Sequence, residues 1–580
     1  MTRLARRGWL LAIVATVVVG CASTAPTRVA SPPPALTAEA AVAMPDAYGA
    51  QVAEDILRAG GNAVDAAVAA AFALAVTYPE AGNLGGGGFM LAYVGGDAVF
   101  LDYREVAPAS ATRDMYLDDR GEVRADASLT GHLAVGVPGT VAGLWAAHER
   151  YGRLPWERVV APSVRLAREG FVGHEHLVGI VAEERSRLAE REDFMRRFGG
   201  IEAGQVFRQP ELAVVLERIA AQGPEAFYRG TTARLIVEEM RRGGGLVTAE
   251  DLQAYAPVWR EPVRSDWRGF EVLSAPPPSS GGFAIVQLLG MTEALAGAFE
   301  GVTHNSAQYV HLLAEMLKRV FADRAEYLGD PAYSEVPLAA LLDPAYVAVR
   351  AAEVDRVAIS PVGRVRPGLE PRHTTHFSIV DAEGNAVANT YTLNTSFGSG
   401  VVVEGGGFLL NNEMDDFSLK PGVPNYYGVV GSTANEIQPG KRMLSSMSPT
   451  LLLEGGRVSV VVGTPGGSTI ITGVYQTLMN VKHFGMSAAD AVVATRVHHQ
   501  LLPPDRVTYS PGRPLPAGIV AELRARGYDP RPHDWEMGDV QLIVRRGDQW
   551  DAASDPRGRG EARRIRPAAV AGPRSGDAAR

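Results

Sequence analysis

Two threonines lie at the ends of a segment that has the pattern of a β-hairpin. Two β-rich runs within residues 374–394 flank a Glu-Gly-Asn sequence, which is typical of a hairpin turn. If Val380 pairs with Ala386, the register brings Thr374 opposite Thr392. Two hydroxyls would then meet at one end of the hairpin, as a nucleophile and its orienting partner require. On these residues alone, the simpler interpretation is a threonine-rich edge strand.

A glycine-rich loop follows a second strand pattern, Val458–Val462. The loop, Gly463–Ser468, leads into a helix expected from Ile470 to about Phe484. The start of a helix after such a loop presents free backbone N–H groups that can bind an anion. A phosphate, a carboxylate or the oxyanion of an acyl transfer would each suit this site. A purely structural turn is the alternative.

Carboxylate and amide side chains gather in Asn411–Phe417, directly after the apolar Phe408–Leu410. Such a cluster can bind calcium, form a solvated turn or hold an ammonium group. The hydroxyls of Ser445 and Ser446 precede another strand pattern, Thr450–Leu453. Because hydroxyls suit a carboxylate and carboxylates suit an amine, the two clusters together would fit an amino-acid-like ligand.

The elements that must position these groups alternate between helical and strand patterns. Two helices are expected within Tyr48–Val76 and a hairpin within Phe89–Leu101. Residues from about 140 to 260 are mostly helical in pattern, and another amphipathic helix is expected at Val310–Tyr327. From residue 373 to about 467, short strands alternate with glycine-bounded turns. The chain is therefore expected to mix helices and sheets.

Composition excludes several classes of protein. The 580 residues include 46% hydrophobic ones, enough for a packed core and too many for wholesale disorder. The formal charge of -9 argues against a nucleic-acid-binding protein, which needs a basic surface. A single cysteine excludes internal disulfides and cysteine-based zinc or iron–sulfur sites. Common nucleotide, zinc-protease and esterase motifs are absent from the sequence, so no cofactor or metal is expected.

The N-terminus has the pattern of a bacterial lipoprotein signal. Three of the first seven residues are arginines, and the apolar Trp9–Val19 that follows is too short for a membrane span of about 20 residues. Because Val18–Cys21 resembles a lipobox, we expect residues 1–20 to be a signal peptide and Cys21 to carry the lipid. Residues 21–37 would be a flexible tether on the periplasmic side of the cell envelope, attached to the outer membrane. An ordinary cleaved signal with a chance cysteine is the alternative.

Together these stretches resemble the γ-glutamyltranspeptidase family of N-terminal-nucleophile hydrolases, over about residues 38–557. The resemblance implies an α+β fold, a four-layer αββα sandwich formed by two subunits of one self-cleaved precursor. The large subunit would span residues 38–373 and the small catalytic subunit residues 374–557. The arginine-rich residues 558–580 are expected to form a mobile basic tail. The motifs that carry the resemblance are Asn83–Phe89, Leu101–Glu105, Pro138–Thr140, Pro276–Gly282, Thr374–His376, Tyr391–Asn394, Asn411–Ser418, Ser445–Thr450 and Gly463–Ser468.

The resemblance also implies catalytic roles. The precursor would cut itself between His373 and Thr374. The freed α-amine of Thr374 would act as general base for its own hydroxyl, and Thr392 would orient that hydroxyl. The backbone N–H groups of Gly466 and Gly467 would form the oxyanion hole.

Substrate recognition is likewise carried over from the resemblance. Arg104, Ser445 and Ser446 would hold the α-carboxylate of a γ-glutamyl substrate. Asn394, Glu413 and Asp416 would hold its α-ammonium, and Tyr427 would stand at the gate of a lid over the site.

The reaction that the resemblance implies is transfer of the γ-glutamyl group of glutathione, or of another γ-glutamyl amide, through an ester on Thr374. Water, an amino acid or a peptide would accept the group. Two alternatives stay open: a glutaryl or cephalosporin acylase of the same superfamily, and a non-catalytic surface lipoprotein with the same fold. The presence of Asp416 favours a γ-glutamyl substrate over those of the acylases.

Overall fold

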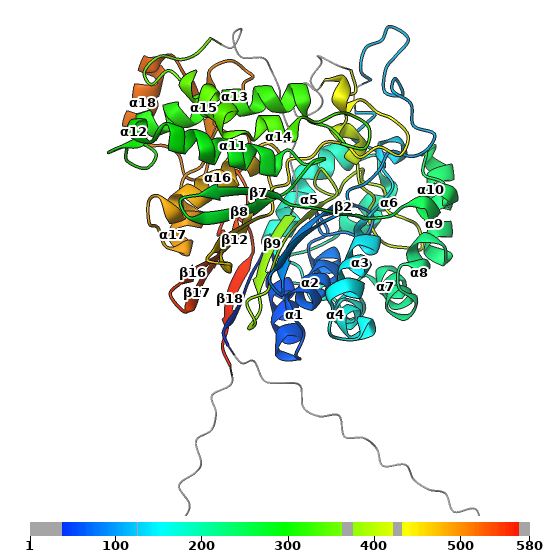
Figure 1. Cartoon of the computed structure of the whole chain (residues 1–580). Helices are drawn as coiled ribbons and strands as arrows, with labels where there is room; N and C mark the ends of the chain where they lie inside the picture. Colours follow the sequence, from blue (N-terminus) through cyan, green and yellow to red (C-terminus); the bar gives the residue numbers. More distant parts are fainter. Residues whose placement is uncertain (1–37, 125, 362–374, 421–431, 568–580) are drawn as a thin grey trace, which may run out of the picture.

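The computed structural model describes most of the chain (Figure 1). The described residues are 38–124, 126–361, 375–420 and 432–567. The predicted signal peptide and tether lie outside them, and so do Cys21, His373, Thr374 and Tyr427.

Two antiparallel sheets form the middle of the molecule, with helices on their outer faces (Figure 1). The strands of the seven-stranded sheet are, in spatial order, β18 (Glu561–Ile565), β1 (Ala40–Met44), β9 (Thr375–Val380), β10 (Ala386–Thr392), β2 (Gly87–Val94), β3 (Asp97–Asp102) and β6 (Val258–Arg260). Those of the six-stranded sheet are β17 (Gln549–Ser554), β16 (Gln541–Arg546), β12 (Arg457–Gly463), β11 (Thr450–Glu454), β8 (Phe270–Ser274) and β7 (Val263–Trp267).

Helices complete the outer layers. On the outer side of the seven-stranded sheet lie α1 (Ala47–Arg58), α2 (Ala63–Thr77), α3 (Thr140–Tyr151) and, packed on α2, α4 (Trp156–Glu169). On the outer side of the six-stranded sheet lie α11 (Gly281–Ala294), α16 (Thr469–Lys482) and, packed on α11, α13 (Ala307–Tyr327). The other helices are α5 (Glu175–Leu188), α6 (Glu192–Phe198), α7 (Pro210–Gln222), α8 (Glu225–Tyr228), α9 (Thr231–Gly243), α10 (Ala249–Ala254), α12 (Ala296–Phe299), α14 (Leu338–Leu341), α15 (Pro344–Ala352), α17 (Ala488–Val493) and α18 (Ala517–Arg526). A small three-stranded sheet contains β13 (Val497–His498), β14 (Arg506–Tyr509) and β15 (Asp529–Pro532). A two-stranded sheet contains β4 (Phe171–Val172) and β5 (Val206–Phe207). Across the described residues, no helix combines the length and the apolar character that a membrane crossing needs.

The alternation of side chains along β1 shows how the layers are held. Val42 belongs to the core that includes Phe72 of α2, whereas Ala41 and Ala43 belong to the core between the two sheets, together with Val460 of β12. Successive residues of a strand point to opposite faces, so the apolar side chains of β1 supply both cores in alternation. The predicted four-layer αββα sandwich is therefore confirmed.

The predicted hairpin register is confirmed over the described residues. Ala386 pairs with Val380, and the pairing continues to Tyr391 opposite Thr375. The turn fixes this register because the carboxylate of Asp381 accepts hydrogen bonds from the backbone N–H groups of the turn at 2.9 and 3.0 Å. Position 374 lies one residue before the first described pair.

The prediction of a mobile tail from residue 558 is wrong for β18. This strand pairs with β1, and Ile565 is fully buried. Its arginines have acidic partners, since Arg563 lies 2.9 Å from Glu54 and Arg564 lies 2.9 Å from Glu39. The low apolar content of this segment suggested a solvated tail, whereas ion pairs and backbone pairing hold it at the edge of the sheet.

Candidate active site

Strands from the two sheets end close together at one end of the sandwich. β10 ends at Thr392 and β12 ends at Gly463. A Cβ atom at Gly463 would lie 2.3 Å from Cε1 of His376 on β9, so only glycine allows this approach of the sheets. Burial lowers the pKa of His376 to about 3, and both ring nitrogens have hydroxyl partners, Thr390 and Ser378. His376 therefore serves as a neutral packing residue between the sheets.

The predicted site residues meet beyond these strand ends. One small pocket, with about 20 Å³ of free space, is lined by Arg104, Thr392, Asn394, Glu413, Asp416, Ser445, Ser446, Met447, Gly467 and Ile470. Of the predicted site residues that the structure describes, only Gly466 does not line this pocket, and it is the neighbour of Gly467. We call this space the Arg104 pocket. Five separate segments of the chain supply it.

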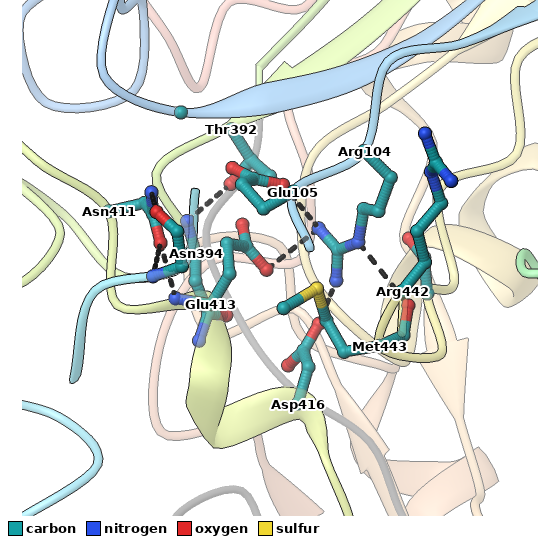
Figure 2. A network of polar contacts seen from close by, with 12 residues as sticks. Arg104, Glu105, Thr392, Asn394, Asn411, Glu413, Asp416, Arg442 and Met443 are labelled. Carbon is teal, nitrogen blue, oxygen red and sulfur yellow. Dashed lines mark hydrogen bonds and ion pairs between the residues drawn. The ribbon is translucent and has the colours of Figure 1, made fainter. Parts of the chain in front are cut away.

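Arg104 is the centre of a buried ionic network (Figure 2). Its side chain is 1% exposed, and its Nη1 atom lies 2.7 Å from a carboxylate oxygen of Glu413, which is fully buried. Nη2 donates to the carboxylate of Asp416. Glu105 contributes a third carboxylate, 3.7 Å from Nη1. Figure 2 shows these three acidic side chains converging on one guanidinium.

The network has more acidic groups than its arginine can neutralise. Burial raises the pKa of Glu105 to about 8 and that of Glu413 well above its ordinary value, although Arg104 opposes both shifts. Burial also raises the pKa of Asp416, again against the effect of Arg104. The acidic groups in turn raise the pKa of Arg104, despite its burial. A bound ammonium group would stabilise the ionised carboxylates, and a bound carboxylate would compete with them for Arg104.

A short 3-10 helix, Glu413–Asp416, carries two of these acids. Asn411 fixes its start, because the side-chain oxygen of Asn411 accepts from the N–H groups of Glu413 and Gly136 at 3.0 and 2.9 Å. Its amide nitrogen donates to two backbone carbonyls. The side-chain amide of Asn411 therefore holds the local backbone, and the carboxylates of Glu413 and Asp416 contact Arg104. This arrangement does not suit the calcium site considered from sequence. Among the described residues, no group of three or more histidine, cysteine or acidic side chains could hold a metal ion.

The turn after β10 holds Asn394 beside the pocket. Its backbone N–H donates to the hydroxyl of Thr392 at 2.7 Å, and its side chain donates to the carbonyl of Asn412 at 3.0 Å. Asn394 has a positive φ of 80°, a conformation that asparagine adopts more readily than most residues. These contacts connect the end of β10 to the segment that carries Glu413.

The proline-rich loop before α11 supports the serines of the pocket. The N–H of Ser445 donates to the carbonyl of Pro278 at 2.8 Å, and the hydroxyl of Ser279 donates to the carbonyl of Met447 at 2.7 Å. Ser280 donates to the carbonyl of Ser445, and Arg324 donates to Ser280 at 2.9 Å. Arg324 therefore places a second cation behind the serines, although burial lowers its pKa to about 9.

The glycine loop after β12 has the geometry of an anion site. Gly466 and Gly467 have φ angles of 129° and 58°, and their carbonyls accept from the first N–H groups of α16 at 3.1 and 3.0 Å. Within the described residues, the N–H groups of these two glycines have no hydrogen-bond acceptor. The loop could therefore donate both N–H groups to an anion at the start of α16.

Sequence reasoning missed Glu105 and Arg324. Glu105 directly follows Arg104 in the sequence. Its role becomes visible only in the folded chain, where Glu413 and Asp416 share the same arginine with it. Arg324 lies in the last turn of α13, with no local motif to distinguish it from a surface arginine of an amphipathic helix. The burial of Arg324, which is 3% exposed, could not be read from the sequence.

Comparison with known proteins agrees with this geometry. The family model described as Gamma-glutamyltranspeptidase matches residues 49–565. A protein of Pseudomonas aeruginosa named glutathione hydrolase proenzyme is 58% identical over 527 residues, which cover 91% of this chain and 95% of that protein. Among solved structures, γ-glutamyltranspeptidase from Pseudomonas nitroreducens complexed with L-DON is 54% identical, with a TM-score of 0.55, and covers 56% of this chain and 96% of its own. Cephalosporin acylase from Bacillus halodurans is 27% identical, with a TM-score of 0.78, and covers 91% of this chain and 96% of its own. The chain therefore belongs to the γ-glutamyltranspeptidase family, whose members are N-terminal-nucleophile hydrolases.

Proposed function

We propose that this enzyme is a γ-glutamyltranspeptidase and glutathione hydrolase whose nucleophile is Thr374. The observation that carries the proposal is the Arg104 pocket, which joins one buried arginine and several buried acids to the start of α16. A γ-glutamyl group carries an α-carboxylate and an α-ammonium on one carbon, so it needs both kinds of partner at one place. The 58% identity to a glutathione hydrolase proenzyme supports the same substrate.

Donor binding would exchange ion pairs within the pocket. The α-carboxylate of the substrate would replace an acid on Arg104, whose planar guanidinium can bind a carboxylate through two N–H groups. Glu413 and Asp416 would then turn to the α-ammonium, with Asn394 beside them. The hydroxyls of Ser445 and Ser446 would complete the carboxylate site. This exchange keeps each buried charge paired, which low-dielectric surroundings require.

Maturation would generate the nucleophile. The hydroxyl of Thr374 would attack the carbonyl of His373, and water would hydrolyse the resulting ester and leave Thr374 as a new N-terminus. A free α-amine has a reference pKa of about 7.7–8.0, so a useful fraction is neutral at pH 7 and can accept a proton. Thr392 ends the strand that pairs with β9, which supports its proposed role in orienting Thr374.

The catalytic cycle would then consist of two acyl transfers. The hydroxyl of Thr374 would attack the γ-carbonyl of the donor, while the N–H groups of Gly466 and Gly467 stabilise the oxyanion. The α-amine would deliver the proton to the leaving amine. Water, an amino acid or a peptide would next attack the γ-glutamyl ester and restore the free threonine.

The mature enzyme would be a heterodimer of residues 21–373, which comprise the tether and the large subunit, and residues 374–580, which include β18. One solved chain of the P. nitroreducens relative covers 56% of this sequence and almost all of its own length, as a separate large subunit would. We further propose that Cys21 carries a lipid that holds the enzyme on the periplasmic side of the outer membrane.

The alternative function is that of an acylase acting on glutaryl or cephalosporin side chains. The match to the B. halodurans acylase is the reason to test it. The two functions differ in their need for an α-ammonium site. The test compares γ-glutamyl and glutaryl p-nitroanilides with wild type and Asp416→Ala. We expect wild type to prefer the γ-glutamyl compound, and the variant to lose about 100-fold in kcat/KM on that compound alone. A wild-type preference for the glutaryl compound would contradict the proposed function.

A further inference from the structure

A second cavity lies on the other side of the glycine loop. It has a volume of about 480 Å³. Pro465 and Gly466 line it, whereas Gly467 lines the Arg104 pocket. The turn after β10 is divided in the same way, since Ser396 lines the second cavity and Asn394 lines the Arg104 pocket. The two spaces therefore share a wall that contains the proposed oxyanion hole.

The side chains around this cavity are predominantly acidic. They include one arginine, Arg557, and one histidine, His176, whose pKa burial lowers to about 4. The acidic lining residues are Glu80, Glu183, Glu184, Asp534, Glu536 and Asp539. Several of them have arginine partners, as Glu80 has in Arg559 at 2.6 Å and Glu184 has in Arg187 at 2.7 Å. The cavity as a whole still offers more acidic than basic groups to a ligand.

Asp539 supplies the observation that points to a ligand. Its residue surface is 7% exposed, and its Oδ2 atom has no hydrogen-bond partner among the described residues. The other oxygen accepts from the side chain of Gln541 at 2.8 Å. Burial raises the pKa of Asp539 well above its ordinary value, and the charge of Asp555 adds to this shift, although Arg496, Arg559 and Arg557 oppose it. A buried acceptor oxygen without a donor is costly, and a bound N–H group would relieve that cost.

We propose that this cavity binds the acyl acceptor and selects acceptors that carry a positive charge besides the attacking amine. Diamines and amides of basic amino acids belong to this class, and acidic peptides do not. The proposal rests on the proposed function above. An acidic surrounding favours the protonated form of an amine, and a protonated amine cannot attack. The cavity would therefore hold the second, charged group while the neutral amine points past Gly466 toward the ester.

The transfer step balances with these groups alone. The neutral amine attacks the carbonyl carbon of the γ-glutamyl ester, a C–N bond forms, and the C–O bond to Thr374 breaks. The proton that the attacking nitrogen loses passes to the oxygen of Thr374 through its α-amine. The threonine hydroxyl is thereby restored, and the product is a γ-glutamyl amide.

The test measures how the acyl-enzyme divides between an acceptor and water. Enzyme is mixed with γ-glutamyl p-nitroanilide and either 1,4-diaminobutane or glycylaspartate, and the ratio of γ-glutamyl product to free glutamate is determined at matched acceptor concentrations. This ratio depends only on molecules that have already formed the ester, so partial misfolding of a variant does not change it. The variants are Glu183→Gln and Asp539→Asn, with Glu175→Gln as the control on the same helix, α5.

We expect wild type to transfer to the diamine about tenfold more efficiently than to glycylaspartate. Each variant should reduce the transfer ratio for the diamine about threefold to tenfold and leave that for glycylaspartate unchanged or higher, whereas the control should match wild type. Equal transfer ratios in wild type and both variants would overturn the inference and leave the proposed function intact. If wild type released no nitroaniline at all, the proposed function would fail and the inference with it.

Discussion

The guanidinium of Arg104 and the carboxylate of Glu413 lie 2.7 Å apart in the interior, although the predicted cleavage point between His373 and Thr374 separates them in the chain. Neither side chain is more than 1% exposed. The large and the small subunit would thus each supply half of the same ion pair. Asp416 joins the pair, so the pocket presents one cation and two anions to a ligand that carries one charge of each sign.

Replacement of Arg104 by lysine should impair donor binding because an ammonium group cannot reproduce the two-pronged contact of a guanidinium. We expect kcat/KM for γ-glutamyl p-nitroanilide to fall about 100-fold or more, mostly through KM. Arg260→Lys is the matched control, since Arg260 pairs with Asp102 outside the pocket at 2.8 Å. Steady-state kinetics of both variants will check this, and a KM for Arg104→Lys close to that of wild type would contradict the proposed carboxylate site.

Glu105→Gln should change the pH dependence of stability. Because the pKa of Glu105 is raised to about 8, the folded state holds a proton that the unfolded state releases above a pH of about 4.5. Wild type therefore loses stability as the pH rises from about 4.5 to about 8, and glutamine, which stays neutral, avoids this loss. The melting temperature of the variant should equal that of wild type at pH 5 and exceed it by about 2–5 °C at pH 9. Thermal unfolding at both pH values measures this, and a variant less stable than wild type at pH 9 would refute the assigned shift.

Gly466→Ala should inactivate the enzyme through the oxyanion loop. A Cβ atom at this position would lie 2.3 Å from the hydroxyl of Thr469, and its φ of 129° disfavours any other residue. Displacement of the loop should reduce kcat about 100- to 1000-fold, the effect of losing an oxyanion donor. Gly485→Ala provides the control, since Gly485 also has a positive φ but open space around it. Equal activity of the two variants would show that the loop has no catalytic role.

Removal of the C-terminal strand should destabilise the protein. β18 pairs with β1, and Arg559 just before it is 2.6 Å from Glu80 and 3.5 Å from Asp46. Because β1 precedes the predicted cleavage point, loss of residues 559–580 would remove contacts between the two subunits. We expect truncation after residue 558 to lower the melting temperature by at least about 5 °C or abolish soluble expression, whereas truncation after residue 567 should leave it unchanged. Equal melting temperatures of the two truncated forms would be inconsistent with a structural role for β18.

The sequence was most informative where local chemistry decides the structure. The hairpin register followed from a short turn, and Asp381 fixes that turn through bonds to its own neighbours. The glycine loop and the helix after it followed from a strand pattern next to glycines. The residues of the Arg104 pocket could be named from the family motifs, and the structure brings all that it describes, apart from Gly466, to one pocket.

The remaining features depend on contacts between distant segments. Arginines at residues 559–564 suggested a solvated tail because their partners, Glu80, Glu54 and Glu39, lie at the other end of the chain. The raised pKa of Glu105 likewise depends on its burial and on the charge of Asp416 from a distant segment, which no local pattern reveals. The acidic cavity combines residues from α5, the glycine loop and the C-terminal segment in the same way.

The most direct test of the account is the cleavage of the chain itself, examined on a denaturing gel with N-terminal sequencing of the smaller fragment. Thr374→Ala is compared with Thr375→Val, because the hydroxyl of Thr375 is buried without a hydrogen-bond partner among the described residues and should be dispensable. We expect two fragments for wild type and Thr375→Val, with the smaller one beginning at Thr374, and a single uncut chain for Thr374→Ala. Active wild-type enzyme that consists of one uncut chain, or a smaller fragment that begins at another residue, would contradict the central claim.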